Sequence, residues 1–374
     1  MLSTAAQLDR VLLPFSAVFG AVIGSFINAA VYRIPRNISL WKEKRSFCPQ
    51  CRAQIAWHDN IPVLSYLLLL GRCRSCRKRI PGRYLVVELL TAGLFAAIYW
   101  HVRILNGPEA AAAGRMTALG WEHLGAYLAL TAGLILAAFC DIEDYEETPE
   151  QKREREKRAR KLKAAGKDIE DEEGPSVYGI IPDEVTVTGL CLALPLALLL
   201  PAIHWNALRL VPPLELGGPA LDLAGRLNAG IDALLGAAVG GGMIWLTGLF
   251  GKLVFRKEAM GFGDVLFVAM IGSILGWKAA LLVFFLAPVF GSIFGITMRV
   301  LRGERYVRYG PFLAAAAVLV IFYEPLLSAY FETAFRGLAA ALQGGAEPGT
   351  DWWHLHHRVP FVDFEKTTRG IAWP

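Results

Sequence analysis

Two long runs without a charged side chain constrain the fold of this 374-residue chain more than any other feature. Residues 11–31 and 279–298 form runs of 21 and 20 residues, and neither run contains Asp, Glu, Lys or Arg. An α-helix needs about 20 apolar residues to cross the hydrocarbon core of a bilayer. The runs therefore indicate an integral membrane protein and exclude a soluble globular enzyme, a disordered chain and a disulfide-stapled secreted domain. A membrane β-barrel is also excluded, because its strands would alternate in polarity.

The rest of the chain predicts an all-α bundle of about eight transmembrane helices. We expect the first segment to be a retained anchor, because its apolar run exceeds the h-region of a signal peptide. The sixth segment is short, with only 13 residues from Val265 to Trp277 before Lys278, and it could be partly re-entrant. The predicted spans cover residues 11–33, 84–102, 122–142, 181–203, 229–251, 264–277, 279–299 and 309–331.

Lys and Arg are concentrated between the spans, and this predicts an orientation. Four segments, at residues 33–83, 152–167, 252–257 and 299–308, hold 28 of the 38. Eight crossings place both termini on one side of the membrane and all four segments on the other, and excess positive charge marks the cytoplasmic side. No basic arm stands apart from the spans, so we expect no nucleic-acid partner.

The same pattern divides the chain into four parts. Residues 1–33 form the first membrane helix, 34–83 a cytoplasmic loop, 84–331 a transmembrane core and 332–374 a C-terminal tail. An insertion at 143–180, with nine basic and twelve acidic residues, interrupts the core. Its helical composition without an apolar face favours a solvated helix or flexible insertion, and a docking segment for a cytoplasmic partner is the alternative.

Four of the six cysteines form a pattern typical of a zinc site. They are Cys48, Cys51, Cys73 and Cys76, in the arrangement C-x2-C-x21-C-x2-C. Two tight turns with two thiolates each can complete a tetrahedral Zn²⁺ site, which would be structural because protein fills all four positions. Two redox pairs or four free thiols are the alternatives. Cys140 and Cys191 lie in apolar runs and are expected to be packing residues.

Three aspartates fall at the predicted cytoplasmic ends of membrane spans. Asp141 ends the third span, Asp183 begins the fourth and Asp264 begins the sixth. An ionisable residue in a span is energetically costly and is a functional candidate by default. Two such carboxyl groups close together could perform acid–base hydrolysis, because repulsion between like charges keeps one protonated while the other is ionised.

Asp264 belongs to the motif GFGD. Gly261 and Gly263 remove side chains just before the acid, so an extended substrate could lie beside the carboxylate. The alternative is a helix N-cap Asp that follows a glycine turn.

Two further acidic residues have simpler interpretations. Glu88 lies one turn inside the second span and could pair with Arg83. Asp232 falls at the opposite membrane boundary, where we expect a solvated capping residue.

The longest motifs resemble those of the prepilin peptidases, the type IV leader peptidase family. They are GSFINAAVYRIP at 24–35, the cysteine-containing segment at 48–93, KEAMGFGD at 257–264 and YGPFLA at 309–314. The resemblance covers about residues 18–330 apart from the charged insertion. One departure is that CDIED at 140–144 and IIPD at 180–183, which are nearly contiguous in the family, are separated here by about 35 residues.

The resemblance implies a bifunctional, integral membrane enzyme. Family members cleave the basic leader of prepilins and pseudopilins after a Gly at the cytoplasmic face. They then N-methylate the new terminal residue with S-adenosylmethionine. The family's two catalytic aspartates match Asp141 and Asp264, and Gly261 and Gly263 complete the second active-site motif.

The insertion leaves a choice for the first catalytic acid. Asp141 and Asp144 both fall in CDIED. We favour Asp141, because it directly follows the apolar run. Asp183 would then support the site or cap a helix.

The resemblance also implies a setting. It places the chain in a bacterial inner membrane, with prepilin or pseudopilin precursors as substrates and pilus or type II secretion assembly proteins as further partners. The methyl donor is expected at the cytoplasmic loops, chiefly 34–83, with no residue assigned to it. The alternatives are a peptidase without methyltransferase activity, against which the intact cysteine loop argues, and a non-catalytic membrane scaffold.

Overall fold

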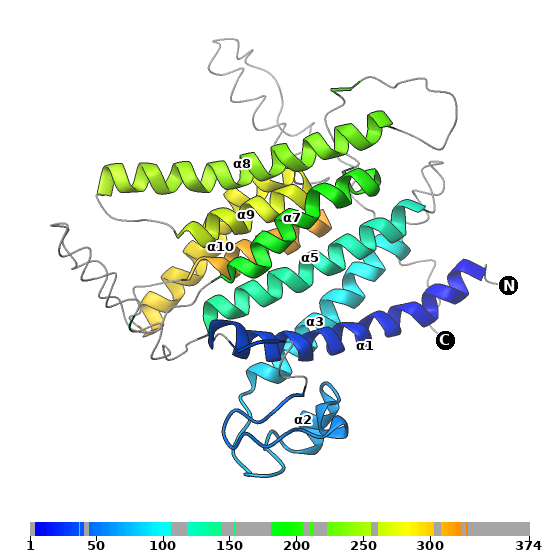
Figure 1. The fold of residues 1–374 in the computed structure, drawn as a ribbon, viewed down its shortest axis with the longest axis vertical. Helices are drawn as coiled ribbons and strands as arrows, with labels where there is room; N and C mark the ends of the chain where they lie inside the picture. Colours follow the sequence, from blue (N-terminus) through cyan, green and yellow to red (C-terminus); the bar gives the residue numbers. More distant parts are fainter. Residues whose placement is uncertain are drawn as a thin grey trace. The chain divides into compact units, whose positions relative to one another are not determined.

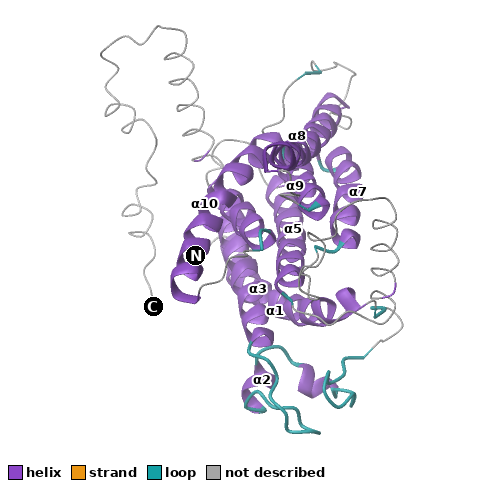
Figure 2. Cartoon of the chain, turned by 90° about the vertical axis from the view of Figure 1, so that its left-hand side faces the viewer, coloured by secondary structure: helices purple, strands orange, loops and turns teal. Residues whose placement is uncertain are grey.

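The computed structural model describes residues 4–36, 38–40, 45–105, 118–143, 181–204, 210–211, 223–255, 261–302 and 308–323, together with 153 and 327. Within these ranges the backbone is mainly helical (Figures 1 and 2), and its β-type pairs are two isolated bridges in the cysteine loop. The predicted all-α fold class is therefore confirmed. Almost all of the charged insertion and the whole predicted tail 332–374 lie outside the described residues.

Eight helices in the described ranges fall on the eight predicted spans. They are α1 (Thr4–Arg33), α3 (Arg83–Tyr99), α5 (Ala118–Ile142), α7 (Asp183–Leu199), α8 (Leu223–Phe255), α9 (Phe262–Leu275), α10 (Trp277–Arg302) and a helix at Gly310–Tyr323. α3 continues as a π-helix at Trp100–Leu105, and a 3-10 turn at Pro201–His204 follows α7. The loop between α1 and α3 contains the short helix α2 (Leu64–Leu68) and 3-10 turns at Ile34–Arg36 and Trp57–Asn60.

The lengths of the helices bear on the membrane prediction. α1, α5, α8 and α10 are long and apolar enough to cross a bilayer, and so is α3 when its π-helical continuation is included. Large apolar side chains on α1, α8 and α10 are exposed on the surface of the chain, as expected where helices face lipid. The chain is therefore a multi-pass membrane protein. α7, with 17 residues, and the two 14-residue helices α9 and Gly310–Tyr323 are shorter, so their crossing of the membrane remains a prediction.

The short sixth segment is the central helix of the second half of the bundle. α9 contacts α7, α8 and α10 (Figure 1), and all of residues 267–273 are buried. Its 14 residues rise roughly 21 Å, less than the ~30 Å hydrocarbon core. Its uniform apolarity is explained because the neighbouring helices, rather than lipid, surround it. The helix ends at Gly276, whose φ of +89° favours a residue without a side chain.

The first half of the bundle is built on the packing of α1 against α3, with α5 beside them (Figure 1). Hydrogen bonds join α1 to α3 at several levels: Ser16 Oγ donates to the carbonyl of Phe95 over 3.0 Å, Asn28 Nδ2 donates to the carbonyl of Tyr84 over 2.9 Å, and Tyr99 Oη donates to Oδ1 of Asp9 over 2.6 Å. A buried apolar cluster between the three helices contains Ile27, Val31, Val87, Ile135 and Cys140. The prediction that Cys140 packs in the core is confirmed.

The predicted catalytic aspartates and the cysteine loop lie at one end of the helix bundle. The C-terminal ends of α1, α5, α8 and α10 and the N-terminal ends of α3, α7 and α9 lie at the same side in Figure 1. The cysteine loop extends from this side, because it connects the end of α1 to the start of α3. All four predicted basic segments adjoin these helix ends in the sequence.

Glycines permit close approach between pairs of helices in each half. On α8, Gly236 lies so close to the Gly272 carbonyl of α9 that a Cβ would clash with it, and the reverse holds for Gly272. On α1, a Cβ at Gly24 would lie 2.8 Å from the Glu88 Cα of α3. Small residues at such contacts are typical of membrane helix pairs, where dispersion between closely packed backbones replaces a hydrophobic driving force.

The expectation for Asp232 is wrong. Its residue is only 4% exposed, and its Oδ2 lies 2.8 Å from Nδ1 of His204, which is also buried. A buried carboxylate needs such a partner, since its desolvation is otherwise uncompensated. The partner comes from the turn that follows α7, so local sequence around Asp232 could not reveal it.

We predict that Gly236→Ala destabilises the bundle. The added methyl group must displace the backbone of α9, and forced overpacking typically costs about 1–3 kcal/mol. Thermal unfolding of the purified protein in detergent should show a lower midpoint than the wild type. Gly242→Ala on the same helix is the matched control, because a Cβ there meets nothing within 4 Å. Equal midpoints for the two variants would contradict this account of the α8–α9 contact.

Candidate functional site

Asp141 lies at the C-terminal end of α5 and is held there by a distant segment. Its side chain is buried, and its Oδ2 accepts a hydrogen bond of 3.2 Å from the backbone N–H of Gly310. A Cβ at Gly310 would lie 2.8 Å from the same oxygen, so only glycine leaves room for the carboxylate. Arg308 donates to the carbonyl of Ile142, next to the acid. The segment 308–310 therefore positions the end of α5.

Asp264 lies in the first turn of α9, with Gly261 as the N-cap residue. Its backbone N–H donates to the Gly261 carbonyl over 3.2 Å. The negative charge of Asp141 acts electrostatically on Asp264, and α5 and α9 contact each other. The structure thus brings together the two aspartates that the sequence singled out, although 122 positions separate them.

The two motif glycines differ in their surroundings. A Cβ at Gly263 would lie 3.5 Å from Cβ of Ile181, in the segment that leads into α7. Among the described residues, a Cβ at Gly261 would meet the Asp264 carboxylate alone, at 3.9 Å. The described residues therefore leave the space at Gly261 otherwise open, which fits an extended segment placed next to Asp264.

No hydrogen bond or ion pair joins Asp183 to the two aspartates among the described residues. Pro182 is the N-cap residue of α7, and no side chain makes a capping hydrogen bond there. Asp183 is exposed in the first turn, where a negative charge is favoured by the helix dipole. Asp183 is therefore not the N-cap residue of α7. Its other predicted role, support of the site, stays a prediction. Asp144 lies outside the described residues.

Glu143 is a functional candidate that sequence reasoning missed. It follows Asp141 by two residues, and its carboxylate contacts Arg83 of α3 and lies 3.5 Å from Nη1 of Arg36. These ion pairs tie the end of α5 to both ends of the cysteine loop. The proposed pairing of Glu88 with Arg83 is therefore not the one formed: Arg83 pairs with Glu143. The only available signal was the position of Glu143 between the two aspartates of CDIED.

The four loop cysteines lie on two turns with the same backbone design. In the first, the N–H of Cys48 donates to Ala53 and the N–H of Arg52 donates back to Cys48, each over 2.9 Å. In the second, Cys73 and Lys78, and Arg77 and Cys73, make the equivalent bonds. Arg52 and Arg77 have φ near +60° at matching positions. The repetition explains how two separate CxxC motifs present their sulfurs in the same way.

The sulfurs of these turns fit a single metal ion. All four lie within 4.8 Å of one another, and the Sγ atoms of Cys48 and Cys76 are 4.0 Å apart. Tetrahedral Zn–S bonds of 2.3 Å place sulfurs about 3.8 Å apart. Hydrogen bonds from the backbone N–H groups of Cys76 and Ser75 lower the pKa of the Cys73 thiol to about 7, which favours the thiolate form that binds metals. Cys191, expected to pack inside, is instead exposed on α7.

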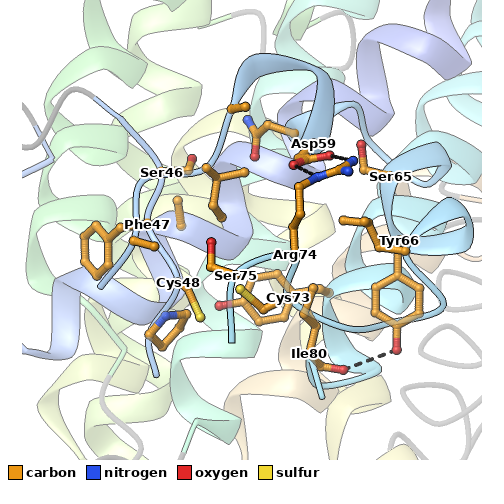
Figure 3. A pocket seen from close by; sticks show the side chains of 18 of the residues that line it. Ser46, Phe47, Cys48, Asp59, Ser65, Tyr66, Cys73, Arg74, Ser75 and Ile80 are labelled. Carbon is orange, nitrogen blue, oxygen red and sulfur yellow. Dashed lines mark hydrogen bonds and ion pairs between the residues drawn. The ribbon is translucent and has the colours of Figure 1, made fainter. Parts of the chain in front are cut away.

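A cavity of about 330 Å³ lies between the cysteine loop and the adjoining parts of α1 and α3. Figure 3 shows the loop side of this cavity, where Asp59 and Arg74 face each other beside Cys48 and Cys73. The guanidinium of Arg74 donates two hydrogen bonds of 2.6 Å to the Asp59 carboxylate and lowers its pKa. This bidentate pair joins the 3-10 turn at Trp57–Asn60 to the second cysteine turn.

Comparison with known proteins gives these features a family context. Residues 18–102 match the Bacterial Peptidase A24 N-terminal domain, and residues 177–296 match the Type IV leader peptidase family. The first match contains α1, the cysteine loop and α3. The second contains the IIPD segment, α7, α8 and the GFGD motif. No solved structure matches the chain.

Several curated relatives carry the name Prepilin leader peptidase/N-methyltransferase. The protein of Myxococcus xanthus is 31% identical over 78% of this chain, and the chain spans 64% of that relative's length. The proteins of Aeromonas hydrophila and Neisseria gonorrhoeae are 27% and 28% identical, and the matches cover 86% and 85% of this chain and 95% and 93% of theirs. The chain therefore belongs to the type IV leader peptidase family.

Proposed function

We propose that this protein is a membrane aspartyl endopeptidase that removes the leader of prepilins or pseudopilins and then N-methylates the new terminal residue. The observation that carries the proposal is the pairing of Asp141 with Asp264 at one end of the helix bundle. Family membership and the names of the relatives support the same reaction class. Asp141 rather than Asp144 is proposed as the first acid, because it directly follows the apolar run of α5 and its charge acts on Asp264.

The proposed cleavage uses the two carboxyl groups in different protonation states. Two acidic groups this close do not both ionise readily, so one keeps its proton. The ionised group accepts a proton from water, whose oxygen attacks the scissile carbonyl, while the protonated group donates a hydrogen bond to the carbonyl oxygen. The Gly310 N–H holds Asp141 in place, and the open space at Gly261 admits the extended peptide.

The position of the aspartates matches the shape of a prepilin. Such a substrate has a short basic leader followed by an apolar helix, so the helix can lie in the bilayer while the cleavage point rests at the membrane boundary. The ends of α5 and α9 would then meet the scissile bond at the cytoplasmic face of a bacterial inner membrane. This orientation follows the concentration of basic residues at the same helix ends.

The cysteine loop is proposed to hold a structural zinc ion and to contribute to methyl transfer. S-adenosylmethionine supplies an electrophilic methyl group on a sulfonium. Cleavage supplies the nucleophile, an α-amino group whose ordinary pKa is near 8, so a modest shift makes it neutral. The zinc would order a loop that has little apolar core of its own. Pilus or type II secretion assembly proteins remain proposed partners, and the charged insertion 143–180 is a candidate docking segment.

Two other proposals fit parts of the same observations. A peptidase without methyltransferase activity would need only the aspartate pair, and its cysteine loop could lose its function. The four sulfurs are still arranged to hold one metal ion, which argues against this alternative. A non-catalytic scaffold would need neither aspartate. The buried, hydrogen-bonded Asp141 argues against the scaffold. Burying an acid costs free energy, and a scaffold would give this carboxyl group no role that explains why the cost is accepted.

We expect Asp141→Asn and Asp264→Asn each to reduce prepilin cleavage by about 10²–10⁴-fold, the range typical for loss of a general acid or base. The measurement is the appearance of mature pilin after co-expression or in vitro with purified enzyme. Glu122→Gln, at the other end of α5, is the matched control. Full cleavage by either aspartate variant would overturn the aspartyl mechanism. Loss of cleavage in Asp144→Asn with retention in Asp141→Asn would reverse the assignment of the first acid.

The zinc proposal is tested by metal analysis of the purified protein. The wild type should contain one zinc per chain, and Cys48→Ser and Cys73→Ser should each lose it, because tetrahedral zinc needs all four thiolates. Cys191→Ser, which lies outside the cluster, should retain the metal. A metal-free wild type, or full zinc in the two cluster variants, would contradict the proposal.

Methylation is tested on the product rather than on the enzyme. Mature pilin made by the wild type should carry one added methyl group on its terminal amine, as determined by mass spectrometry. Unmethylated but correctly cleaved pilin would favour the alternative of a peptidase without methyltransferase activity.

A further inference from the structure

The short helix α2 and the turns beside it expose large apolar side chains, although the cysteine loop lies outside the predicted membrane spans. We call this set of side chains the leucine patch. It consists of Trp57, Ile61, Leu64, Leu67, Leu68 and Leu70. Leu68 and Leu70 are 82% and 84% exposed. A group of exposed apolar side chains of this size marks an interaction surface.

The two faces of α2 are arranged in the reverse of a soluble helix. Its inner face carries Ser65, which is buried and donates a hydrogen bond of 2.9 Å to the carbonyl of His58. Tyr66 is half-buried, and its hydroxyl donates to the carbonyl of Ile80 over 3.3 Å. The three leucines at 64, 67 and 68 are spaced three and four residues apart, so they share the outer face. A helix in water directs its apolar side chains toward the core, so this arrangement indicates apolar surroundings.

The backbone fixes this orientation at both ends of α2. Val63 precedes the helix with φ +62°, and Leu70 follows it with φ +50°. Residues other than glycine rarely adopt positive φ, so packing must impose it at both positions. The N–H of Gly71 also donates to the carbonyl of Tyr66 over 2.8 Å. The leucines are therefore held outward and cannot turn inward by a simple rotation of the helix.

α2 begins beside the membrane helices rather than beyond their ends. The N–H of Val63 donates to Oε2 of Glu88 over 2.7 Å, and Ser25 of α1 makes a further hydrogen bond to Glu88. Glu88 lies five residues after Arg83, the first residue of α3, which places Val63 roughly 7.5 Å inside the end of that helix. α2 lies below α1 and α3 in both views of the chain (Figures 1 and 2). Because α3 crosses the membrane, this level is the membrane boundary.

The neighbouring helices expose apolar side chains at the same level. Val86, Leu89 and Leu90 of α3 all lie within two residues of Glu88, and each is between 40% and 55% exposed. On α1, Phe26 is also exposed. These side chains belong to helix faces that are expected to meet lipid. A lipid surface that covers those faces would therefore reach the leucine patch as well.

Basic side chains adjoin the leucine patch in the second cysteine turn. They are Arg72, Arg74, Arg77, Lys78 and Arg79, and all five are exposed. Anionic lipid headgroups attract such a segment, and an exposed Trp such as Trp57 is favoured at a membrane interface. The same cations would repel the basic leader of a prepilin. The apolar and the charged features together therefore favour a lipid surface over the proposed substrate.

We propose that the leucine patch is an interfacial membrane anchor for the cysteine loop. Its leucines insert into the lipid leaflet at this end of the bundle, and the cations of the second cysteine turn contact anionic headgroups. Interfacial helices bury their apolar face about 5–10 Å into the boundary between headgroups and acyl chains, which agrees with the level of Val63. The anchor holds the loop against the sides of α1 and α3. This inference goes beyond the proposed function and does not depend on catalysis by the aspartates.

The first test is photo-crosslinking of the full-length protein in liposomes of phosphatidylethanolamine and phosphatidylglycerol. The photoreactive residue p-benzoylphenylalanine replaces Leu68 in one variant, and it replaces the exposed Gln54, which follows the first cysteine turn, in the control. We expect about tenfold more phospholipid adduct at position 68, measured by mass spectrometry, because this side chain lies among acyl chains. Equal adduct yields at the two positions would overturn the proposal. Crosslinks from position 68 to a second copy of the chain, or to added prepilin, in place of lipid would also overturn it.

The second test removes part of the anchor without changing charge. In liposomes that present this end of the bundle outward, Leu67→Gln combined with Leu68→Gln should make trypsin cleave the basic residues 72–79 about tenfold faster, because the loop loses apolar contact with lipid. Leu246→Gln combined with Leu249→Gln, at exposed positions of α8, is the matched control and should leave this rate unchanged.

A thermal midpoint equal to that of the wild type in detergent shows that the Leu67→Gln, Leu68→Gln variant is folded. A wild-type rate of trypsin cleavage in the folded variant would contradict the anchor. If the midpoint falls, the crosslinking result at position 68 decides between the anchor and a surface that does not contact lipid.

Discussion

The constraint on which this structure depends is the cost of placing charge in a hydrocarbon layer. The apolar helices of the described ranges carry few ionisable groups in their interiors, and most such groups fall at helix ends and in connections. Asp141 ends α5 and Asp264 lies in the first turn of α9, so both carboxyl groups fall at the same end of the bundle. The cysteine loop emerges from that end as well. Elsewhere in the helices a buried acid needs its own partner, as Asp232 has in His204, so the unpaired acids and the cysteine loop fall at this one boundary.

Close packing of the helices then positions the two aspartates at this end of the bundle. α9 is shorter than a crossing helix, and its burial among α7, α8 and α10 fixes where its first turn lies. The close contact between Gly236 and Gly272 constrains the position of α9 along α8. On the other side, the N–H of Gly310 and the side chain of Arg308 hold the end of α5. Glycines therefore allow the two close contacts that position the aspartates, one between α8 and α9 and one between Gly310 and Asp141.

The sequence predicted what depends on local composition and spacing. Apolar runs located the helices, although α1 and α8 begin earlier, at Thr4 and Leu223, than the predicted 11 and 229, and the CxxC pairs located a four-sulfur cluster. It could not predict contacts whose two partners are far apart in the chain. The pairing of Glu143 with Arg83, of Asp232 with His204 and of Glu88 with Val63 all depend on which helices are neighbours. Glu88 had been assigned to the nearest cation and Asp232 to solvent, and Glu143 had no assignment, whereas tertiary packing supplied each of the three with a partner.

Glu143 joins the end of α5 to both ends of the cysteine loop, and this bears on the order of the proposed reactions. Methyl transfer requires a free amine, which exists only after the leader has been removed. A pilin helix that stays in the bilayer keeps its new terminus at the depth of Asp141. The cavity at the first turns of α3 lies at that same boundary, because Arg83 bridges Tyr84 in its wall to Glu143 at the end of α5. A terminus released at the aspartates therefore stays at the end of the bundle from which the cysteine loop emerges, the loop proposed to contribute to methyl transfer, and its apolar helix need not leave the membrane.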